Sequence, residues 1–146
     1  MEEKLQAKVL LVDDEEEFCK ILSERLENRG MKVSAVLSGE DAVARVEDQN
    51  FDAIIVDLAM PGIDGLETLR RIKEKRPDLE ILMLTGHGTV KSGIEAMKLG
   101  AEDFLEKPVD MKVLLEKIGE AKHKRMLILE KKSQEEVENI IRSKSW

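Results

Sequence analysis

Five short patches, far apart along this chain, carry side chains that could do chemistry, and each falls where a strand pattern ends. They are Asp13-Asp14, Asp57, Thr85, Phe104 and Lys107-Pro108. Because parallel strands gather their carboxyl ends along one edge of a sheet, we expect these patches to meet in a single site. That site would hold three carboxylates, one hydroxyl and one ammonium. Such a set suits the binding of a divalent cation and the acceptance of a phosphoryl group.

The expected metal is Mg²⁺ (or Mn²⁺), because the predicted ligands are few and all are oxygens. Carboxylates held close together repel one another, which raises the pKa of one of them unless a cation joins the group. Each patch also has a plain structural explanation as a helix cap, a turn or a helix entry. Those explanations give no reason for reactive types to recur at four of the five predicted strand ends, so we favour the functional interpretation.

Five repeats of a strand pattern and a helix pattern position the patches. Apolar runs predict strands at 8–12, 32–36, 51–56, 80–84 and 103–105, and each is followed by apolar residues at helical spacing. This alternation predicts an α/β fold with a parallel sheet covered on both faces. The right-handed crossover rule favours a doubly wound (βα)5 topology with strand order 2-1-3-4-5. No glycine-rich loop follows the first strand, which disfavours a nucleotide site.

Composition and charge narrow the class of protein. The net charge of −7 argues against direct nucleic-acid binding by the chain as a whole. The balance is uneven, since residues 122–146 carry seven Lys/Arg against four Glu (+3). No stretch approaches the ~20 apolar residues of a membrane span, and no signal peptide is evident, so we expect a cytoplasmic protein without membrane insertion. Cys19, the single cysteine, lies in an apolar helical pattern and is expected to be a buried thiol.

The sequence resembles the receiver (CheY-like) domain of bacterial two-component response regulators. The motifs that carry the resemblance are LLVDDEE, IIVDLAMPGIDGLE, ILMLTGHG and GAEDFLEKPVD, in this order along the chain. The last two are closest in wording to receivers attached to σ54-dependent transcription activators. The resemblance covers about residues 6–121. We therefore expect a receiver (phosphoacceptor) domain at 1–121 and a helical extension or linker at 122–146.

This resemblance implies a role for each acidic residue. Asp57 would be the phosphoacceptor, taking the phosphoryl group from a phosphohistidine of a sensor histidine kinase to form an aspartyl phosphate. Asp14 and Asp57 would bind the metal directly, and Asp13 would bind it mainly through water. The backbone carbonyl of Ala59 would supply a further ligand. The chain would then be a signalling domain and not an enzyme, with self-phosphorylation from small donors and slow loss of the phosphoryl group.

The same resemblance implies a conformational switch. The ammonium of Lys107 would neutralise the transferred group, and the Lys107–Pro108 peptide bond is expected to be cis. The hydroxyl of Thr85 would move to the phosphoryl group, and Phe104 would turn inward into the space it leaves. A downstream output protein or domain would read the altered surface of helix 4, strand 5 and helix 5. The alternative for Phe104 is simple filling of the core.

Two further positions are expected to set the lifetime of the phosphoryl group. His87, two residues after Thr85, would flank the group on one side. The small Ala59 on the other side would leave room for the hydrolytic water. His123 lies among lysines and is expected on the surface.

The last segment reads as a helix with apolar residues at irregular intervals, because Lys and Ser interrupt any long heptad stripe. It would pack on the domain or pair with a second copy, so a homodimer could form through this helix or through the helix 4–strand 5–helix 5 surface. The alternative is a frayed linker to an output domain. The sequence shows no helix-turn-helix or ATPase motif, which favours protein contact as the output.

Three rival functions fit the sequence less well. A phosphatase of the haloacid-dehalogenase type would need a second Asp two residues after the nucleophile, where this chain has Ala59. A flavin or nucleotide module of similar topology would need a glycine-rich loop and aromatic residues around the ring. A receiver that is never phosphorylated would lack a key residue, and none is missing here.

Overall fold

The computed structural model describes residues 6–86 and 90–143, which form five strands and five helices in strict alternation. The strands are β1 Lys8–Val12, β2 Lys32–Val36, β3 Ala53–Asp57, β4 Ile81–Thr85 and β5 Asp103–Glu106. The helices are α1 Glu16–Glu27, α2 Gly39–Arg45, α3 Gly65–Lys75, α4 Val90–Lys98 and α5 Met111–Ser143.

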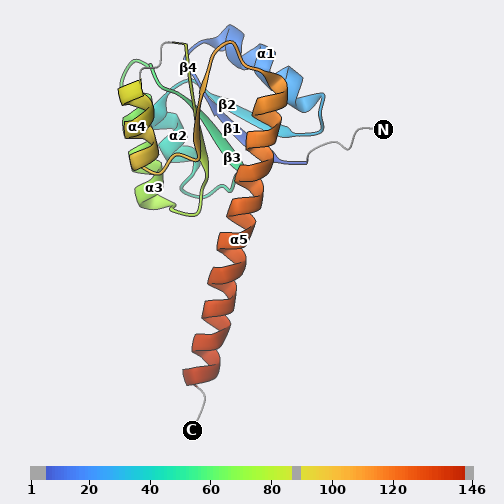
Figure 1. Ribbon diagram of the computed structural model, residues 1–146, viewed down its shortest axis with the longest axis vertical. Helices are drawn as coiled ribbons and strands as arrows, with labels where there is room; N and C mark the ends of the chain where they lie inside the picture. The colour runs from blue at the N-terminus through green and yellow to red at the C-terminus, as the bar shows by residue number, and fades with distance from the viewer. Residues whose placement is uncertain (1–5, 87–89, 144–146) are drawn as a thin grey trace.

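All neighbouring strands run parallel, and their order in the sheet is β2-β1-β3-β4-β5. This confirms the predicted doubly wound (βα)5 fold. Helices α1 and α5 cover one face of the sheet, and α2, α3 and α4 cover the other (Figure 1). The chain leaves β1 and β3 toward opposite faces, so a crevice opens between the carboxyl ends of these two adjacent strands. Asp13 follows β1 directly, and Asp57 is the last residue of β3.

The hydrophobic core has two layers because successive strand residues point to opposite faces. In β1, Val9 and Leu11 pack toward α1 and α5, whereas Leu10 and Val12 pack toward the other three helices. All four are at most 1% exposed. This burial on both faces explains why the strands read as continuous apolar runs and not as alternating ones.

The boundaries of several elements differ slightly from those expected. Strands β3 and β4 each end one residue later, because Asp57 pairs with Leu84 and Thr85 pairs with Glu106 in the parallel register. Asp57 and Thr85 are therefore part of the sheet and not of the loops after it. Helix α1 begins at Glu16, earlier than expected, since acidic residues are favourable in a first helical turn.

Helix α5 runs without interruption through the segment that the sequence left open between helix and linker. Its last buried residue is Ala121. Just beyond Ala121, two cations of the helix form ion pairs with residues that precede β4 and β5. Lys124 Nζ lies 2.9 Å from Glu102 Oε2, and Arg125 Nη2 lies 3.2 Å from Asp78 Oδ2. The predicted C-terminal helical extension is thus confirmed.

Beyond Arg125 the helix projects away from the rest of the domain (Figure 1). Most apolar side chains of this part are exposed, among them Met126, Leu129, Val137 and Ile140. Within the described ranges, no helix combines the length and the apolar character needed to cross a membrane.

Candidate functional site

Three carboxylates meet at the carboxyl edge of the sheet. Asp13, Asp14 and Asp57 each offer an oxygen within 4.8 Å of the others, and no other such cluster of acidic, histidine or cysteine ligands occurs in residues 6–86 and 90–143. Asp13 and Asp57 are buried, whereas Asp14 is exposed. A set of oxygen ligands with one side open to water fits a hydrated divalent cation such as Mg²⁺.

The loop between β1 and α1 fixes Asp13 from several sides. The backbone N–H of Asp13 donates to the carbonyl of Val36 in β2 at 3.2 Å, and its carboxylate accepts from the N–H of Glu15 at 2.9 Å. The buried thiol of Cys19 donates to the Asp13 carbonyl at 3.3 Å. Burial, then the charge of Asp13, raises the pKa of Cys19 to about 11, so the thiol stays protonated at neutral pH.

Lys107 reaches into the acidic cluster from the loop after β5. Its Nζ lies 2.9 Å from Asp13 Oδ2, 3.4 Å from Glu15 Oε1 and 3.9 Å from Asp57 Oδ1. Burial by itself would lower the pKa of Lys107. The hydrogen bond with Asp13 and the nearby acidic charges outweigh that effect, so the pKa is raised and the side chain is a cation at neutral pH. The peptide bond between Lys107 and Pro108 is cis.

The surroundings of Asp57 disfavour its ionised form, because nearby positive charge does not fully offset burial and the charge of Asp13. Burial, followed by the charge of Asp13, raises its pKa from 3.8 to about 6. Lys107 and a hydrogen bond from the backbone N–H of Ala59 act in the opposite direction and only partly compensate. A cation placed among the three carboxylates would favour the ionised form of Asp57.

The loop from β3 to α3 is held against the site by a close backbone approach. The N–H of Gly65 donates to the carbonyl of Leu58 at 2.9 Å. A Cβ atom at Gly65 would lie 2.3 Å from the carbonyl oxygen of Asp57, so only glycine fits. The side chain of Asp64 caps α3 by accepting from the N–H of Glu67. Ala59 lies exposed in this loop, and its backbone N–H donates a hydrogen bond to Asp57.

Thr85 and Phe104, two of the remaining predicted site residues, lie at different distances from the carboxyl edge of the sheet. Thr85 is buried at the carboxyl end of β4. Phe104 is not at a strand end: it is the second residue of β5, pairs in register with Met83, and packs toward α4 at Gly93. The expectation that all five patches meet at the edge is therefore wrong for Phe104, because β5 continues for two residues beyond it. His87 lies outside the described residues.

Sequence reasoning missed two neighbours of Lys107. Glu15 forms the ion pair already described, and the ring of Phe18 in α1 lies 4.1 Å from Lys107 Nζ, measured to the ring centroid. In the sequence, Glu15 stands in a run of acidic residues and Phe18 at an apolar position of the first helical pattern. No local sequence signal links either residue to a lysine about 90 positions later. Gly65, by contrast, stands inside a motif that the sequence had already singled out.

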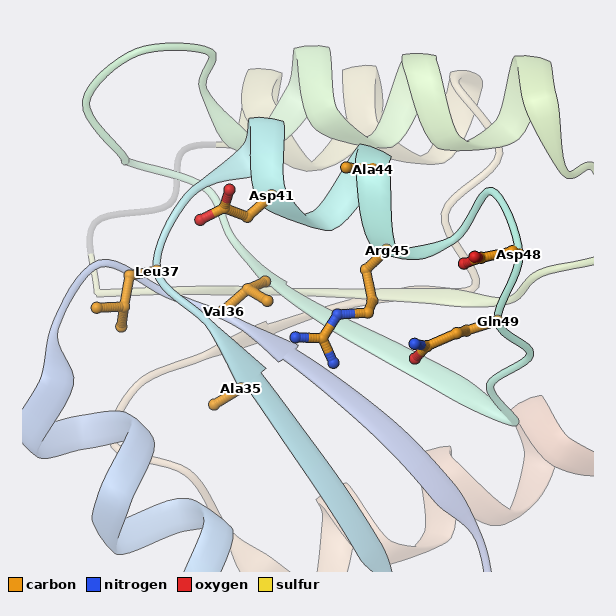
Figure 2. A pocket seen from close by; sticks show the side chains of 8 residues that line it. All are labelled: Ala35, Val36, Leu37, Asp41, Ala44, Arg45, Asp48 and Gln49. Carbon is orange, nitrogen blue, oxygen red and sulfur yellow. The ribbon is translucent and has the colours of Figure 1, made fainter.

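Away from the acidic cluster, a hollow of about 570 Å³ lies between the edge strand β2 and helix α2. Figure 2 shows Arg45 extending across it from α2, with Asp41 and Asp48 near its ends. It contains none of the residues of the acidic cluster. Its mixed lining places no nucleophile beside a base and no group of metal ligands, so it carries no candidate chemistry.

The fold and the acidic edge together define a domain of the receiver type. The chain belongs to the response regulator receiver domain family, whose sequence profile matches residues 9–119. This is a family of signalling domains of two-component systems, and the resemblance of the motifs is thereby confirmed.

Individual relatives agree with this assignment. The chain is 38% identical over 129 residues to the C4-dicarboxylate transport transcriptional regulatory protein DctD of Pseudomonas aeruginosa, and 39% identical over 113 residues to the transcriptional regulatory protein ZraR of Salmonella typhimurium. These matches cover 88% and 77% of this chain. They span only 28% and 26% of the two relatives, which are much longer. Both relatives are transcriptional regulators, in keeping with the likeness to receivers of σ54-dependent activators.

Among solved structures, the beryllofluoride-activated NtrC4 receiver domain dimer superposes with a TM-score of 0.76 at 36% identity. The match covers 81% of this chain and 98% of that one. The shared fold therefore extends over about four fifths of this chain.

Proposed function

We propose that this chain is the phosphoacceptor of a two-component system and that Asp57 receives the phosphoryl group. The observation that carries the proposal is the placement of Lys107 and two further carboxylates around Asp57, with Lys107 Nζ 3.9 Å from Asp57 Oδ1. Membership of the receiver family supports the same role. A division into a receiver at 1–121 and an extension at 122–146 goes with this proposal, as does a cytoplasmic location.

The donor in this proposal is a phosphohistidine of a sensor histidine kinase. The bond between phosphorus and the histidine nitrogen breaks with its electron pair leaving on the nitrogen, while a carboxylate oxygen of Asp57 bonds to phosphorus. Phosphoryl transfer needs in-line positioning and neutralisation of charge more than covalent assistance. Lys107 supplies one positive charge beside the oxygens of the transferred group. The raised pKa of Asp57 reflects burial and the charge of Asp13, which disfavour its ionised form, and a further cation would stabilise that form as the nucleophile.

Asp14, Asp57 and the backbone carbonyl of Ala59 would hold Mg²⁺ directly in this proposal, with Asp13 mainly bound through water. When bound, the cation would supply the charge that the cluster lacks and would orient the phosphoryl oxygens. The buried position of Asp13 and the exposed position of Asp14 suit a cation that keeps several waters.

The proposed output is a change in the surface formed by α4, β5 and α5. Thr85 ends the strand next to β3, so its hydroxyl has a short path to a group on Asp57. Phe104 is half-buried between β5 and α4, where a shift of the β4–α4 loop would change its packing. The exposed apolar side chains of α4, which are Val90, Ile94 and Met97, would lie on the face that a downstream protein or domain reads.

A second copy of the chain is the partner we propose for the extended part of α5. Met126 and Val137 are eleven residues apart, and so are Leu129 and Ile140. Eleven residues make slightly more than three helical turns, so these four exposed apolar residues line one face of the helix. The α4–β5–α5 surface is the alternative site of dimer formation. The related NtrC4 receiver is a dimer in its beryllofluoride-activated form.

The decisive experiment is to incubate the chain with Mg²⁺ and acetyl phosphate and to measure its intact mass. The expected result is one phosphoryl adduct that is absent without Mg²⁺ and absent from the Asp57→Asn variant. Asp48→Asn, which changes an exposed aspartate outside the cluster, is the matched control and should take up one phosphoryl group. An adduct that persists in Asp57→Asn would assign the phosphoacceptor elsewhere. No adduct in the wild type, with acetyl phosphate or with histidine kinases as donors, would contradict the proposal.

A further inference from the structure

The ammonium of Lys107 has an aromatic neighbour, the ring of Phe18 in α1. Its Nζ lies 4.1 Å from the centroid of the Phe18 ring, which is within the range of a cation–π interaction. The Lys107 side chain is only 16% exposed, so the interaction is partly shielded from water and stronger than one on an open surface.

The other neighbours do not fix this position by themselves. Asp13 accepts a hydrogen bond at 2.9 Å, but a lysine can rotate about one hydrogen bond. Glu15 lies 3.4 Å away with its side chain 65% exposed, and an exposed ion pair of this kind restrains little. The ring of Phe18 therefore supplies the second fixed contact. It also lines a hollow of about 420 Å³ beside Lys107, into which the ammonium could otherwise turn.

We propose that Phe18 is a positioning residue for Lys107. The ring holds the ammonium between Asp13 and Asp57 and prevents the lysine side chain from turning toward solvent. The inference rests on the proposed function, because the position matters for phosphoryl transfer. Lys107 Nζ stands 3.9 Å from Asp57 Oδ1, farther than the ~2.7–2.9 Å of a charge-assisted hydrogen bond. At that distance the ammonium lies beside Asp57 without a hydrogen bond to Oδ1, so it can pair with the oxygens of a group transferred to Asp57.

The kinetic test compares Phe18→Leu, which removes the ring, with Phe18→Tyr, which keeps it. With acetyl phosphate and saturating Mg²⁺, the initial rate of adduct formation should fall roughly threefold to tenfold in Phe18→Leu, given the strength of partly buried cation–π contacts. It should stay within about twofold of wild type in Phe18→Tyr. Ile21→Val is the matched control, since Ile21 lines the same hollow one turn along α1 and should not alter the rate.

A double substitution separates positioning from a general loss of structure. In a Lys107→Met background, Phe18→Leu should have no further effect on the rate, because no ammonium is left to place. If Phe18→Leu slows the reaction by the same factor with and without Lys107, the ring supports the fold only and the proposal is overturned. An unchanged rate in the single variant Phe18→Leu would overturn it as well.

A nuclear magnetic resonance measurement tests the placement without any phosphorylation. The ring current of Phe18 should shift the ε-CH₂ protons of Lys107 upfield of those of other lysines in the wild type and in Phe18→Tyr. The shift should vanish in Phe18→Leu. Lys107 resonances at ordinary positions in the wild type would overturn the proposal. If the wild type takes up no phosphoryl group, the proposed function fails, and this shift alone decides whether Phe18 places Lys107.

Discussion

The ammonium nitrogen of Lys107 lies 3.9 Å from Oδ1 of Asp57, which is an ion-pair distance but too long for a hydrogen bond. Lys107 donates its hydrogen bonds to Asp13 at 2.9 Å and, more weakly, to Glu15 at 3.4 Å. The ammonium of Lys107 is thus shared by the two buried carboxylates, and it lies closer to Asp13 than to Asp57. Burial, followed by the charge of Asp13, therefore raises the pKa of Asp57 in spite of the lysine beside it.

Replacement of Asp57 by asparagine should stabilise the folded chain at neutral pH. The folded-state pKa of about 6 lies above the ordinary 3.8, so the folded state binds more protons than the unfolded state between these values. The contribution of Asp57 to the free energy of unfolding therefore falls as the pH rises from about 4 to about 6. At pH 7 the destabilisation by the ionised carboxylate has reached nearly its full value. We expect Asp57→Asn to raise the free energy of unfolding by about 1–3 kcal/mol at pH 7.

Urea unfolding followed by circular dichroism, with divalent cations chelated, measures this effect. The gain from Asp57→Asn should disappear near pH 4, where the native aspartate is protonated. The exposed Asp48→Asn should show little change at either pH. An equal gain for Asp57→Asn at both pH values would show that the burial and charge of Asp57 are not its cause.

Removal of the shared cation should have the opposite effect. Lys107→Met leaves Asp13 and Asp57 buried without their common partner, so the free energy of unfolding should fall by about 1–3 kcal/mol at pH 7 without divalent cations. Mg²⁺ should stabilise this variant more than it stabilises the wild type, because it replaces the missing charge. Lys117→Met breaks the surface pair with Asp103 and should show no such added response to Mg²⁺. Equal Mg²⁺ responses in wild type and Lys107→Met would contradict a shared site.

The arrangement of the acidic cluster could be predicted because it follows from the topology. Asp13, Asp14 and Asp57 stand at the ends of apolar runs, and a parallel sheet brings such ends together whatever the detail of the side chains. The ends of β3 and β4 were misplaced by one residue, since the hydrophobic pattern stops at Val56 and Leu84 while the backbone pairing continues.

The contacts of Lys107 could not be predicted in this way. They depend on where α1 starts and on which way Phe18 and Glu15 point across a loop from another part of the chain. The helix beyond residue 121 was predicted, with a frayed linker as the alternative, but the contacts that hold it could not be predicted. The ion pairs of Lys124 and Arg125 that fasten it join residues from 22 to 47 positions apart, and no periodicity encodes them.

Gly65 should be one of the least replaceable residues of the chain. A methyl group there would lie 2.3 Å from the carbonyl oxygen of Asp57 and 2.6 Å from Leu58 Cα, both parts of the backbone. We expect Gly65→Ala to lower the free energy of unfolding by about 1–3 kcal/mol or more and to slow the phosphorylation of Asp57, because the loop carrying Ala59 must shift.

Gly119 is the matched control for that substitution. It lies within α5, and a Cβ atom there would meet nothing within 4 Å. Gly119→Ala should therefore stabilise the chain by up to about 1 kcal/mol through helix propensity. Urea unfolding of both variants compares the two glycines directly. A Gly65→Ala chain as stable as the wild type would show that the β3–α3 loop can move away at no cost.

The four exposed apolar residues on one face of α5, here called the exposed stripe, give the sharpest test of self-association. They are Met126, Leu129, Val137 and Ile140. In a dimer built on this stripe, Val137 and Ile140 would face their counterparts in the second copy, so lysines at both positions would place like charges together. We expect Val137→Lys with Ile140→Lys to be monomeric under conditions where the wild type is a dimer, as measured by sedimentation velocity with Mg²⁺ and beryllofluoride. Glu138→Lys adds the same charge on a different side of the helix and should leave the dimer intact.

Ile94→Lys distinguishes the two interfaces, because Ile94 is exposed on α4 and remote from the stripe in sequence. Loss of the dimer in Ile94→Lys alone would assign the contact to the α4–β5–α5 surface, and a wild type that stays monomeric at high concentration would exclude both. None of the α5 substitutions should change the unfolding of the domain, since Ala121 is the last buried residue of the helix. A change in self-association without a change in stability would therefore locate the interface on the projecting part of α5.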